Sequence, residues 1–444
     1  MGHIVRIEGS PRDAGRCYGE LAAAALRERV AEMWEASKAS RWGASQLDER
    51  GERFRCFVER AAPEWLDEAE AIAAASGVNA TDLFVLNALP PGFWQPPGAG
   101  CTSCLVAGSQ SATGHTLLHK NRDLVNSTQD FHVRRTADGR QMFASRDIGS
   151  LGLAHFHSDR ALAGANNTGS HIKPEELRDC GLACTHLLRL IAERAGTCDE
   201  ALAVLDEALS KEVAGGSGGH RGTIFLIADP GKGLVVEMTS KRLASREVRD
   251  ATLIRTNHFL LDEMLSTLSE PPQQNTLRRY ERAHELLDPL PLKNMADLVR
   301  LSRDNNDGPD SICSDNWQHL HMTVSACTHS VRADTSDPLA HSRVQMGNTR
   351  NTIAIPVPRA IDGLPVECVD GTMHSLARQL YARHGVGDHL AQIQDEMERG
   401  IARQFARVGA AAKFADPTRI REHLTEFVAR TVEAVRATLE ALLA

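Results

Sequence analysis

Residues 100–123 read GCTSCLVAGSQSATGHTLLHKNRD, and this stretch decides how we read the rest of the chain. It follows QPPGAG at residues 95–100, a linker rich in proline and glycine that breaks both helices and strands. After the linker, CLVAGS and HTLLHK alternate with the period of two that is typical of strands. We therefore expect a hairpin that returns Lys120, Asn121 and Asp123 to the side of Cys101.

The Gly100–Cys101 pair has the chemistry that a self-cleaving chain requires. Gly100 has no Cβ, so a thiol can approach its carbonyl group closely. An N-to-S acyl shift followed by hydrolysis of the thioester would leave Cys101 as a new N-terminus. Its α-amine would have a pKa of about 7.7–8.0, so nucleophile and general base would lie on one residue. Asp123 can orient that amine, and Lys120 can hold the thiol as thiolate. Taken alone, however, a Gly–Cys pair more often marks a buried structural cysteine.

The chain on either side of this stretch changes from helices to strands and back to helices. Residues 4–8 alternate as a short strand, and Ser10-Pro11 opens a helical stretch that reaches about residue 40. A second helical stretch covers about residues 47–76. Strands dominate after the linker, and the pattern becomes helical again from about residue 373, with Asp416-Pro417 opening the last helix. This order indicates an α+β fold with helical extensions.

The bulk composition bounds the class of protein. The chain has 444 residues, of which 42% are hydrophobic and 24% charged, enough for a sizeable core. A net charge of −8 argues against a nucleic-acid partner, because a protein that binds nucleic acid needs a basic face. We find no apolar run long enough to cross a membrane and no apolar signal core at the start, so we expect a cytoplasmic protein. Its ten cysteines are then expected to be reduced thiols.

Several separated segments together resemble the acyl-CoA:6-aminopenicillanic acid acyltransferase family of self-processing cysteine Ntn-hydrolases. They occur in the family's order over roughly residues 4–350. They are IEGSPRDAGRCYGE at 7–20, GCTS at 100–103, KNRD at 120–123, AGANNTG at 163–169, IFLIADPGKGLVVE at 224–237, RTNHF at 255–259 and TLRRYERA at 276–283. Each segment is short, and it is their combination that is specific.

The resemblance implies a fold and a division of the chain. The implied fold is the Ntn-hydrolase αββα sandwich, in which two stacked antiparallel sheets lie between helix layers. We expect residues 1–100 to be a helical segment that self-cleavage releases as a separate chain. Residues 101–370 are then the catalytic domain, and residues 371–444 are a helical extension. The expected product is a self-cleaved heterodimer, with a higher homo-oligomer left open.

The resemblance also implies the roles of individual residues. Cys101 would be the nucleophile, freed by scission after Gly100, with Asp123 near its amine. Asn257 would help form an oxyanion hole, where one amide donor can contribute about 2.7–4 kcal/mol. Lys120, Asn121 and Asn166 are the expected substrate-binding residues, and Asn166 is a second oxyanion candidate. The implied activity is hydrolysis or transfer of an acyl group from a small, linear, non-peptide amide through an acyl-thioester on Cys101, in the manner of penicillin acylases.

The chain departs from the family pattern at one position, and this leaves alternatives open. SICSD at 311–315 has Ser314 where the family's active-site arginine is expected, so Lys120 or Arg122 is left to supply the positive charge. One alternative is therefore a catalytically diverged protein with the same fold. Another is a thiol redox or zinc protein that uses the Cys101-x-x-Cys104 spacing.

We assign no cofactor and no metal from the sequence. The pairs His155-x-His157 and His319-x-His321 each place two imidazoles on one strand face. Two histidines without further ligands are weak evidence for a metal site.

Overall fold

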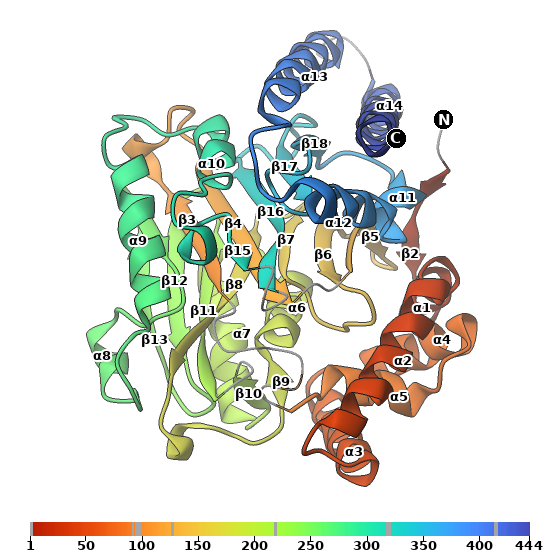
Figure 1. Ribbon diagram of the computed structural model, residues 1–444, viewed down its shortest axis with the longest axis vertical. Coiled ribbons are helices and arrows are strands. Elements are labelled where there is room, and N and C mark those ends of the chain that lie inside the picture. The colour runs from red at the N-terminus through yellow and green to blue at the C-terminus, as the bar shows by residue number, and fades with distance from the viewer. Residues whose placement is uncertain are drawn as a thin grey trace.

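Two β-sheets lie face to face in the computed structural model of the chain (Figure 1). The structure describes residues 3–90, 93, 100–125, 128–216, 220–316, 321–412 and 416–444. The first sheet contains, in spatial order, β13 (Leu243–Val248), β12 (Gly233–Met238), β11 (Arg221–Ala228), β8 (Ala163–His171), β7 (His155–Ser158), β6 (Gln141–Asp147), β5 (Gln129–Thr136) and β2 (Ile7–Gly9). Its neighbouring strands are antiparallel except for the parallel pair β2 and β5.

The second sheet is antiparallel throughout. It contains β14 (Thr252–Arg255), β3 (Cys101–Val106), β4 (Thr116–Val125), β16 (His321–Val331), β17 (His341–Met346) and β18 (Ile355–Pro358), with β15 (Asp315–Asn316) paired to β16. Strands β3 and β4 contact β8 and β11 of the first sheet, so the two sheets share a core. Leu105 and Leu118 from the second sheet meet Ile224 and Leu226 from the first in that core. Strands buried on both faces are expected to be apolar along their length, as β11 is over residues 224–228.

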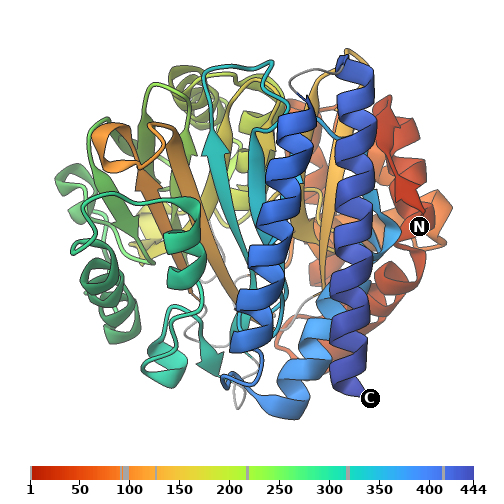
Figure 2. The same ribbon diagram turned by 90° about the horizontal axis from the view of Figure 1, so that it is seen from above.

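Helices cover the outer face of each sheet. Helices α6 (Cys184–Arg194) and α7 (Cys198–Ser210) lie against the first sheet. The second sheet is covered by α9 (Gln274–Leu287), α10 (Met295–Leu301), α12 (Thr372–His384), α13 (Ala391–Ala412) and α14 (Pro417–Leu443). Figure 2 shows α13 and α14, in dark blue, as two long helices side by side across its strands. The predicted αββα sandwich is therefore confirmed.

The N-terminal helices form a group at one side of the sandwich (Figure 1). They are α1 (Pro11–Leu21), α2 (Ala23–Ala39), α3 (Ala44–Ala61), α4 (Glu64–Ser76) and α5 (Ala80–Asn87). The predicted helical regions are present, but each of the two long stretches is divided. Pro63 separates α3 from α4, because proline lacks the amide hydrogen and clashes with the preceding turn. The predicted strand at residues 4–8 is likewise two short ones, β1 (Ile4–Val5) and β2.

Two predicted helix starts are confirmed by their caps. Ser10 accepts a hydrogen bond from the amide of Asp13, whose carboxylate accepts one in return from Ser10. Asp416 accepts from the amides of Thr418 and Arg419, at the beginning of α14. The remaining short elements are β9 (Leu182–Ala183), β10 (Ala214–Gly216), β19 (Leu364–Pro365), α8 (Asp262–Leu265), α11 (Val366–Val369) and three single 3₁₀ turns, η1 (Gly108–Gln110), η2 (Pro174–Glu176) and η3 (Gly308–Asp310).

A buried ionic cluster joins the N-terminal helices to the sandwich. Glu68 on α4 accepts two hydrogen bonds of 2.8 Å from Arg134 on β5. It also accepts one from Arg189 on α6 and lies 3.9 Å from Arg146 on β6. Although burial acts in the opposite direction, the three guanidinium groups hold the pKa of Glu68 well below its ordinary value. Together with β2 in the first sheet and β1 paired to β19, this cluster ties the first 90 residues to the body.

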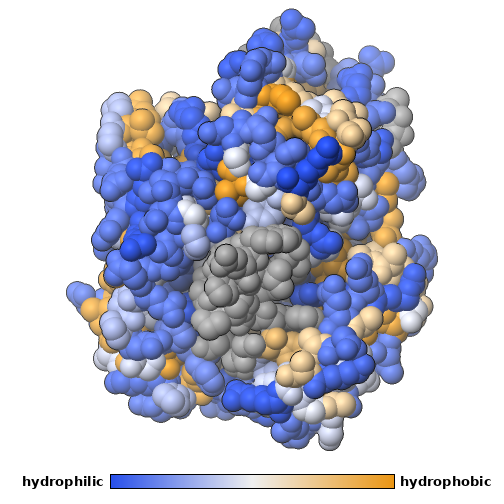
Figure 3. Space-filling model, in the orientation of Figure 1, coloured by the Kyte–Doolittle hydropathy of each residue, from blue (hydrophilic) through white to orange (hydrophobic). Residues whose placement is uncertain are grey.

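The outer surface on the face seen in Figure 1 is mainly hydrophilic. Figure 3 shows apolar side chains gathered near the top of this face, in the area of α12, α13 and α14. Within the described residues, none of the helices combines the length and the apolar character that crossing a bilayer requires.

Candidate active site

The hairpin of β3 and β4 places a lysine beside the candidate nucleophile. Cys101 is the first residue of β3, and the antiparallel register sets Lys120 opposite Ser103. Because alternate residues of a strand share a face, Cys101 and Ser103 both point toward the first sheet, as does Lys120 from β4. The ammonium nitrogen of Lys120 lies 3.1 Å from the sulfur of Cys101. The predicted hairpin is confirmed, and the thiol lies buried between the two sheets.

Hydrogen bonds to the first sheet orient the ammonium group of Lys120. Its ammonium group donates to the main-chain oxygen of Asn166 and, at 3.1 Å, to Oδ1 of Asn167, both on β8. The same Asn167 oxygen accepts a 2.7 Å hydrogen bond from Ser103. The three N–H donors of the ammonium group therefore meet three acceptors, which are the two asparagine oxygens and the Cys101 sulfur. Lys120 therefore places a fixed positive charge 3.1 Å from the Cys101 sulfur.

The Gly100–Cys101 peptide is held on both sides. The carbonyl oxygen of Gly100 accepts a 2.9 Å hydrogen bond from the backbone amide of Asp123. The amide of Cys101 donates to Oδ1 of Asn257 at 2.8 Å, and its carbonyl oxygen accepts from Arg279 at 2.6 Å. The bond that we expect to break is thus fixed by groups from β4, α9 and the segment after β14.

A side chain at position 100 would displace the two groups that hold the peptide. A Cβ built on Gly100 would lie 2.5 Å from Nη2 of Arg279 and 3.0 Å from Oδ1 of Asn257. Glycine therefore permits the close approach of these two groups to the peptide. Residues 95–99 of the predicted linker lie outside the described residues.

Arg279 places a second positive charge at the Gly100–Cys101 peptide, in addition to that of Lys120 at the thiol. It is fully buried on α9 and also donates to Oδ1 of Asn257 at 2.7 Å. Its guanidinium group lies 3.9 Å from Asp123. Burial lowers the pKa of Arg279, while the nearby Asp123 and Cys101 act to raise it. Arg122, one of the two residues expected to fill this role, instead pairs with Asp147.

Asp123 is a buried carboxylate, and only one of its oxygens accepts a hydrogen bond from the described residues. Its Oδ1 accepts a 2.6 Å hydrogen bond from Thr323, and its Oδ2 has no hydrogen-bond partner among the described residues. Burial raises the pKa of Asp123 from its ordinary value of 3.8 to about 6, although Arg279, Thr323 and Lys120 all act to lower it. A carboxyl group with this pKa can exchange a proton near neutral pH.

Ser314 acts on this carboxylate indirectly, through Thr323. Its backbone amide donates to Thr323 Oγ1 at 2.9 Å, and its own hydroxyl donates to the carbonyl oxygen of Pro309. The position that lacks the expected arginine thus helps orient the threonine that holds Asp123.

The predicted asparagines differ in where they point. Asn257 turns its oxygen toward the Cys101 amide, while its Nδ2 donates to the main-chain oxygen of Thr168 at 2.7 Å. Asn166 contacts Lys120 through its backbone, and its side chain donates to Leu153. Asn121 lies on the opposite face of β4, where Nδ2 donates to two main-chain carbonyls and Oδ1 meets the His119 ring. The structure therefore gathers the other predicted residues at Gly100–Cys101, Asn166 through its backbone only, but not the Asn121 side chain.

Cys101 and Cys104 lie on opposite faces of β3. Cys104 packs in the apolar cluster beneath α9 and α10, with Ile254 and Leu298. Burial raises the pKa of Cys104 to about 12, which keeps its thiol protonated. The two sulfurs have different environments, so this geometry gives no support to a redox pair or shared zinc site.

Two stacked sheets between helix layers, with a buried thiol at the first residue of an inner strand, make this chain an αββα sandwich. Residues 162–336 match the model of the family described as acyl-coenzyme A:6-aminopenicillanic acid acyl-transferase. This match confirms the resemblance expected from the sequence. The matched segment contains Asn166, Asn257 and Arg279.

Matches among solved structures include two hydrolases. A mutant of the conjugated bile acid hydrolase from Clostridium perfringens has 11% sequence identity and a TM-score of 0.37, covering 58% of this chain and 92% of that chain. The Caenorhabditis elegans ortholog of N-acylethanolamine-hydrolyzing acid amidase has 11% identity and a TM-score of 0.35, covering 53% of this chain and 96% of that chain. Comparison with curated protein sequences finds no significant match.

Proposed function

We propose that the chain cleaves its own Gly100–Cys101 bond and then works as an amidohydrolase or acyltransferase on small linear amides, in the manner of penicillin acylases. One observation carries the proposal. The Cys101 thiol lies 3.1 Å from a buried ammonium group, while the peptide bond just before it is held by hydrogen bonds at both ends. The family match supports acyl-group chemistry.

In the first reaction, the Cys101 thiolate attacks the carbonyl carbon of Gly100. The backbone amide of Asp123 already donates to the carbonyl oxygen, so it is in place to stabilise the oxyanion. The C–N bond then breaks, the nitrogen of Cys101 takes a proton, and a thioester links Gly100 to the sulfur. Water hydrolyses this thioester, which leaves a carboxylate on Gly100 and a free thiol and α-amine on Cys101.

In each later turnover, the new α-amine acts as general base for the thiol beside it. Asn257 Oδ1, which accepts from the Cys101 amide before cleavage, remains the acceptor that orients the amine. The thiol attacks the substrate carbonyl, the amine product leaves, and the acyl group stays on Cys101 as a thioester. Water completes a hydrolysis, and another acceptor completes a transfer.

The remaining residues divide into those that contact the thiol or the new amine and those that hold these groups in position. We assign Asp123 and Arg279 to the charge balance around the new amine, since their charged groups lie 3.9 Å apart and Arg279 shares the Asn257 Oδ1 acceptor with the Cys101 nitrogen. The second Nδ2 hydrogen of Asn257 is the proposed oxyanion donor during turnover, and Asn166 is a second candidate. Lys120 holds the thiolate and borders the acyl site, while Asn121 serves to fix β4 to the segments beneath it.

We propose that the two products of self-cleavage stay together as a heterodimer. Residues 1–100 would form the released helical chain, 101–370 the catalytic domain and 371–444 the helical extension. The Glu68 cluster and the β2–β5 pairing hold the first chain after the bond is cut. All ten cysteines lie in the described part of the chain and none forms a disulfide, which supports a reducing, cytoplasmic location.

Trapping of the acyl-enzyme tests this function. The purified protein is mixed with an N-acyl p-nitroanilide or an activated ester, quenched in acid and digested for mass spectrometry. We expect the acyl mass on the peptide that begins at Cys101, released p-nitroaniline and no adduct in Cys101→Ala. Cys104→Ala is the matched control, because that thiol lies on the opposite strand face, and it should acylate normally. An adduct on another cysteine, or equal turnover by Cys101→Ala, would remove Cys101 from the mechanism.

A further inference from the structure

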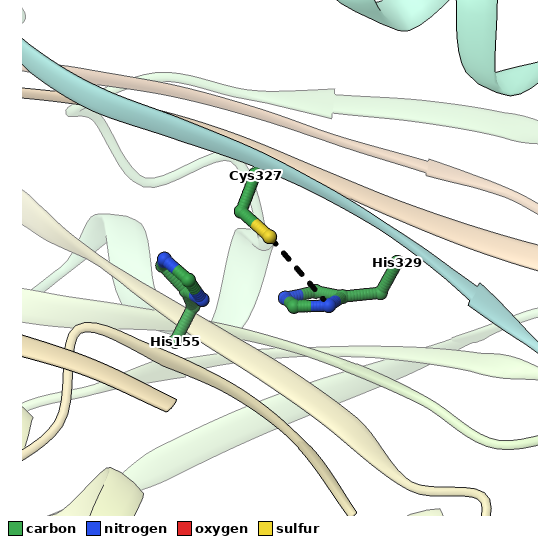
Figure 4. A group of neighbouring side chains, drawn as sticks. All are labelled: His155, Cys327 and His329. Carbon is green, nitrogen blue, oxygen red and sulfur yellow. Dashed lines mark hydrogen bonds between the residues drawn. The ribbon is translucent and has the colours of Figure 1, made fainter. Parts of the chain in front are cut away.

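His155, Cys327 and His329 form a second group of reactive side chains between the sheets (Figure 4). His155 extends from β7 of the first sheet, and Cys327 and His329 extend from β16 of the second. Figure 4 shows the three side chains directed toward a common space. One ligand atom from each lies within 4.8 Å of the other two, and each residue is at most 1% exposed.

The histidines of this group have hydrogen-bonding capacity that the described residues leave unused. Neither ring nitrogen of His155 has a hydrogen-bond partner in the described structure, and the same holds for Nε2 of His329. Buried polar atoms are almost always bonded, so orphaned nitrogens directed into one space indicate a ligand. Nδ1 of His329 lies 2.7 Å from the hydroxyl of Ser342. When Nδ1 donates to that oxygen, Nε2 presents a bare lone pair, which is how metal-binding imidazoles are commonly oriented.

The spacing of the group suits a metal ion. Metal–nitrogen and metal–sulfur bonds of about 2.0–2.3 Å set ligand atoms roughly 3.3–3.8 Å apart. The candidate ligand atoms of the three residues, which all lie within 4.8 Å of one another, approach this spacing. His157, the next histidine on the same face of β7, lies outside the group but contacts Ser342 at 3.3 Å.

The surrounding charge favours a monovalent ion. Cys327 lies opposite Lys120 in the β4–β16 register, and Lys120 and Arg122 both place positive charge near His155. A Cu(I) ion with one thiolate and two neutral imidazoles forms a complex of zero net charge. A Zn(II) ion would leave one positive charge in a buried space beside two cations, at a large desolvation cost. Structural zinc also takes four ligands as a rule, whereas this group offers three, and copper accepts both thiolate and imidazole ligands.

We propose that His155, Cys327 and His329 bind one Cu(I) ion. Cys327 releases its thiol proton when it binds, and the ion bridges β7 of one sheet to β16 of the other. The pair His155-x-His157 was weak evidence in the sequence because its partners come from a strand far along the chain. The site is separate from the proposed acyl chemistry and does not depend on it.

Copper analysis of the purified full-length protein tests the site. The protein is expressed in copper-supplemented medium, dialysed anaerobically against the Cu(I) chelator bathocuproine disulfonate and analysed for metal. We expect about one copper per chain, an X-ray absorption spectrum with one sulfur and two nitrogen ligands, and at least a tenfold loss of copper in Cys327→Ser. Cys104→Ser, an equally buried thiol outside the group, should keep its copper.

A second variant keeps the test independent of folding. His155→Gln should also lose copper while circular dichroism shows an unchanged fold. Wild-type protein without bound copper, or Cys327→Ser and His155→Gln with full copper, would overturn the proposal. Zinc retained in preference to copper would overturn it too, because the charge argument selects the monovalent ion.

Discussion

Replacing Asp123 by asparagine should make the protein more stable at neutral pH while it damages the proposed active site. Asp123 is buried, and one of its oxygens has no hydrogen-bond partner among the described residues. Asparagine has nearly the same shape and can still accept the 2.6 Å hydrogen bond from Thr323. The substitution therefore removes a buried charge and keeps the main contact.

The size of the effect follows from the pKa of this carboxyl group. Burial raises the pKa from 3.8 to about 6. Between these values the folded state binds more protons than the unfolded state, so stability falls as the pH rises through this window. Because one pKa unit corresponds to about 1.4 kcal/mol, ionised Asp123 costs about 3 kcal/mol above pH 6. The neutral asparagine side chain carries no such cost, and below about pH 4 the two proteins should be similar.

Urea unfolding measures this difference. Both proteins carry Cys101→Ala, so that the chain stays intact, and are unfolded at pH 4 and pH 7.5. We expect Asp123→Asn to raise the free energy of unfolding by up to about 3 kcal/mol at pH 7.5 and by little at pH 4. A difference that is the same at both pH values, or a variant that is less stable at pH 7.5, would refute this account of Asp123.

Three further substitutions probe the site and the attachment of the first chain. Gly100→Ala places a Cβ 2.5 Å from the Arg279 guanidinium group, and we expect self-cleavage, followed as a time course on a denaturing gel, to slow at least tenfold. Gly400→Ala is the control and should cleave at the normal rate, because its Cβ meets open space. Lys120→Met removes the ammonium group next to the thiol, so alkylation of Cys101 by iodoacetamide should slow by about tenfold or more, since thiolate is the reactive form; an unchanged rate by peptide mapping would show that Lys120 does not activate the thiol. Glu68→Gln leaves buried guanidinium groups without their carboxylate and should lower the free energy of unfolding by about 3–5 kcal/mol. After cleavage, residues 1–100 should dissociate from residues 101–444 at a lower urea concentration than in the wild type. Gel filtration that shows the wild-type urea dependence would contradict this.

The sequence was most informative where the structure is local. The β3–β4 hairpin follows from alternation across a short turn, and the caps at Ser10 and Asp416 follow from residues a few positions apart. The same local patterns did not locate the break between α3 and α4, because helical apolar spacing continues on both sides of Pro63.

The parts that escaped sequence reasoning depend on contacts between distant segments. Arg279 was present in the TLRRYERA match, but it reaches Cys101 only because α9 packs beside β14, the neighbour of β3. Asn167 neighbours the predicted Asn166, and only the facing of β8 toward β4 reveals that its side chain orients Lys120. The His155 group likewise requires two strands from different sheets.

The intact mass of the purified protein, joined to sequencing of its N-termini, tests the central claim most directly. The account predicts two chains that remain associated, one ending at Gly100 and one of residues 101–444 that begins with Cys-Thr-Ser-Cys. Active protein in which the bond between residues 100 and 101 is unbroken would contradict it.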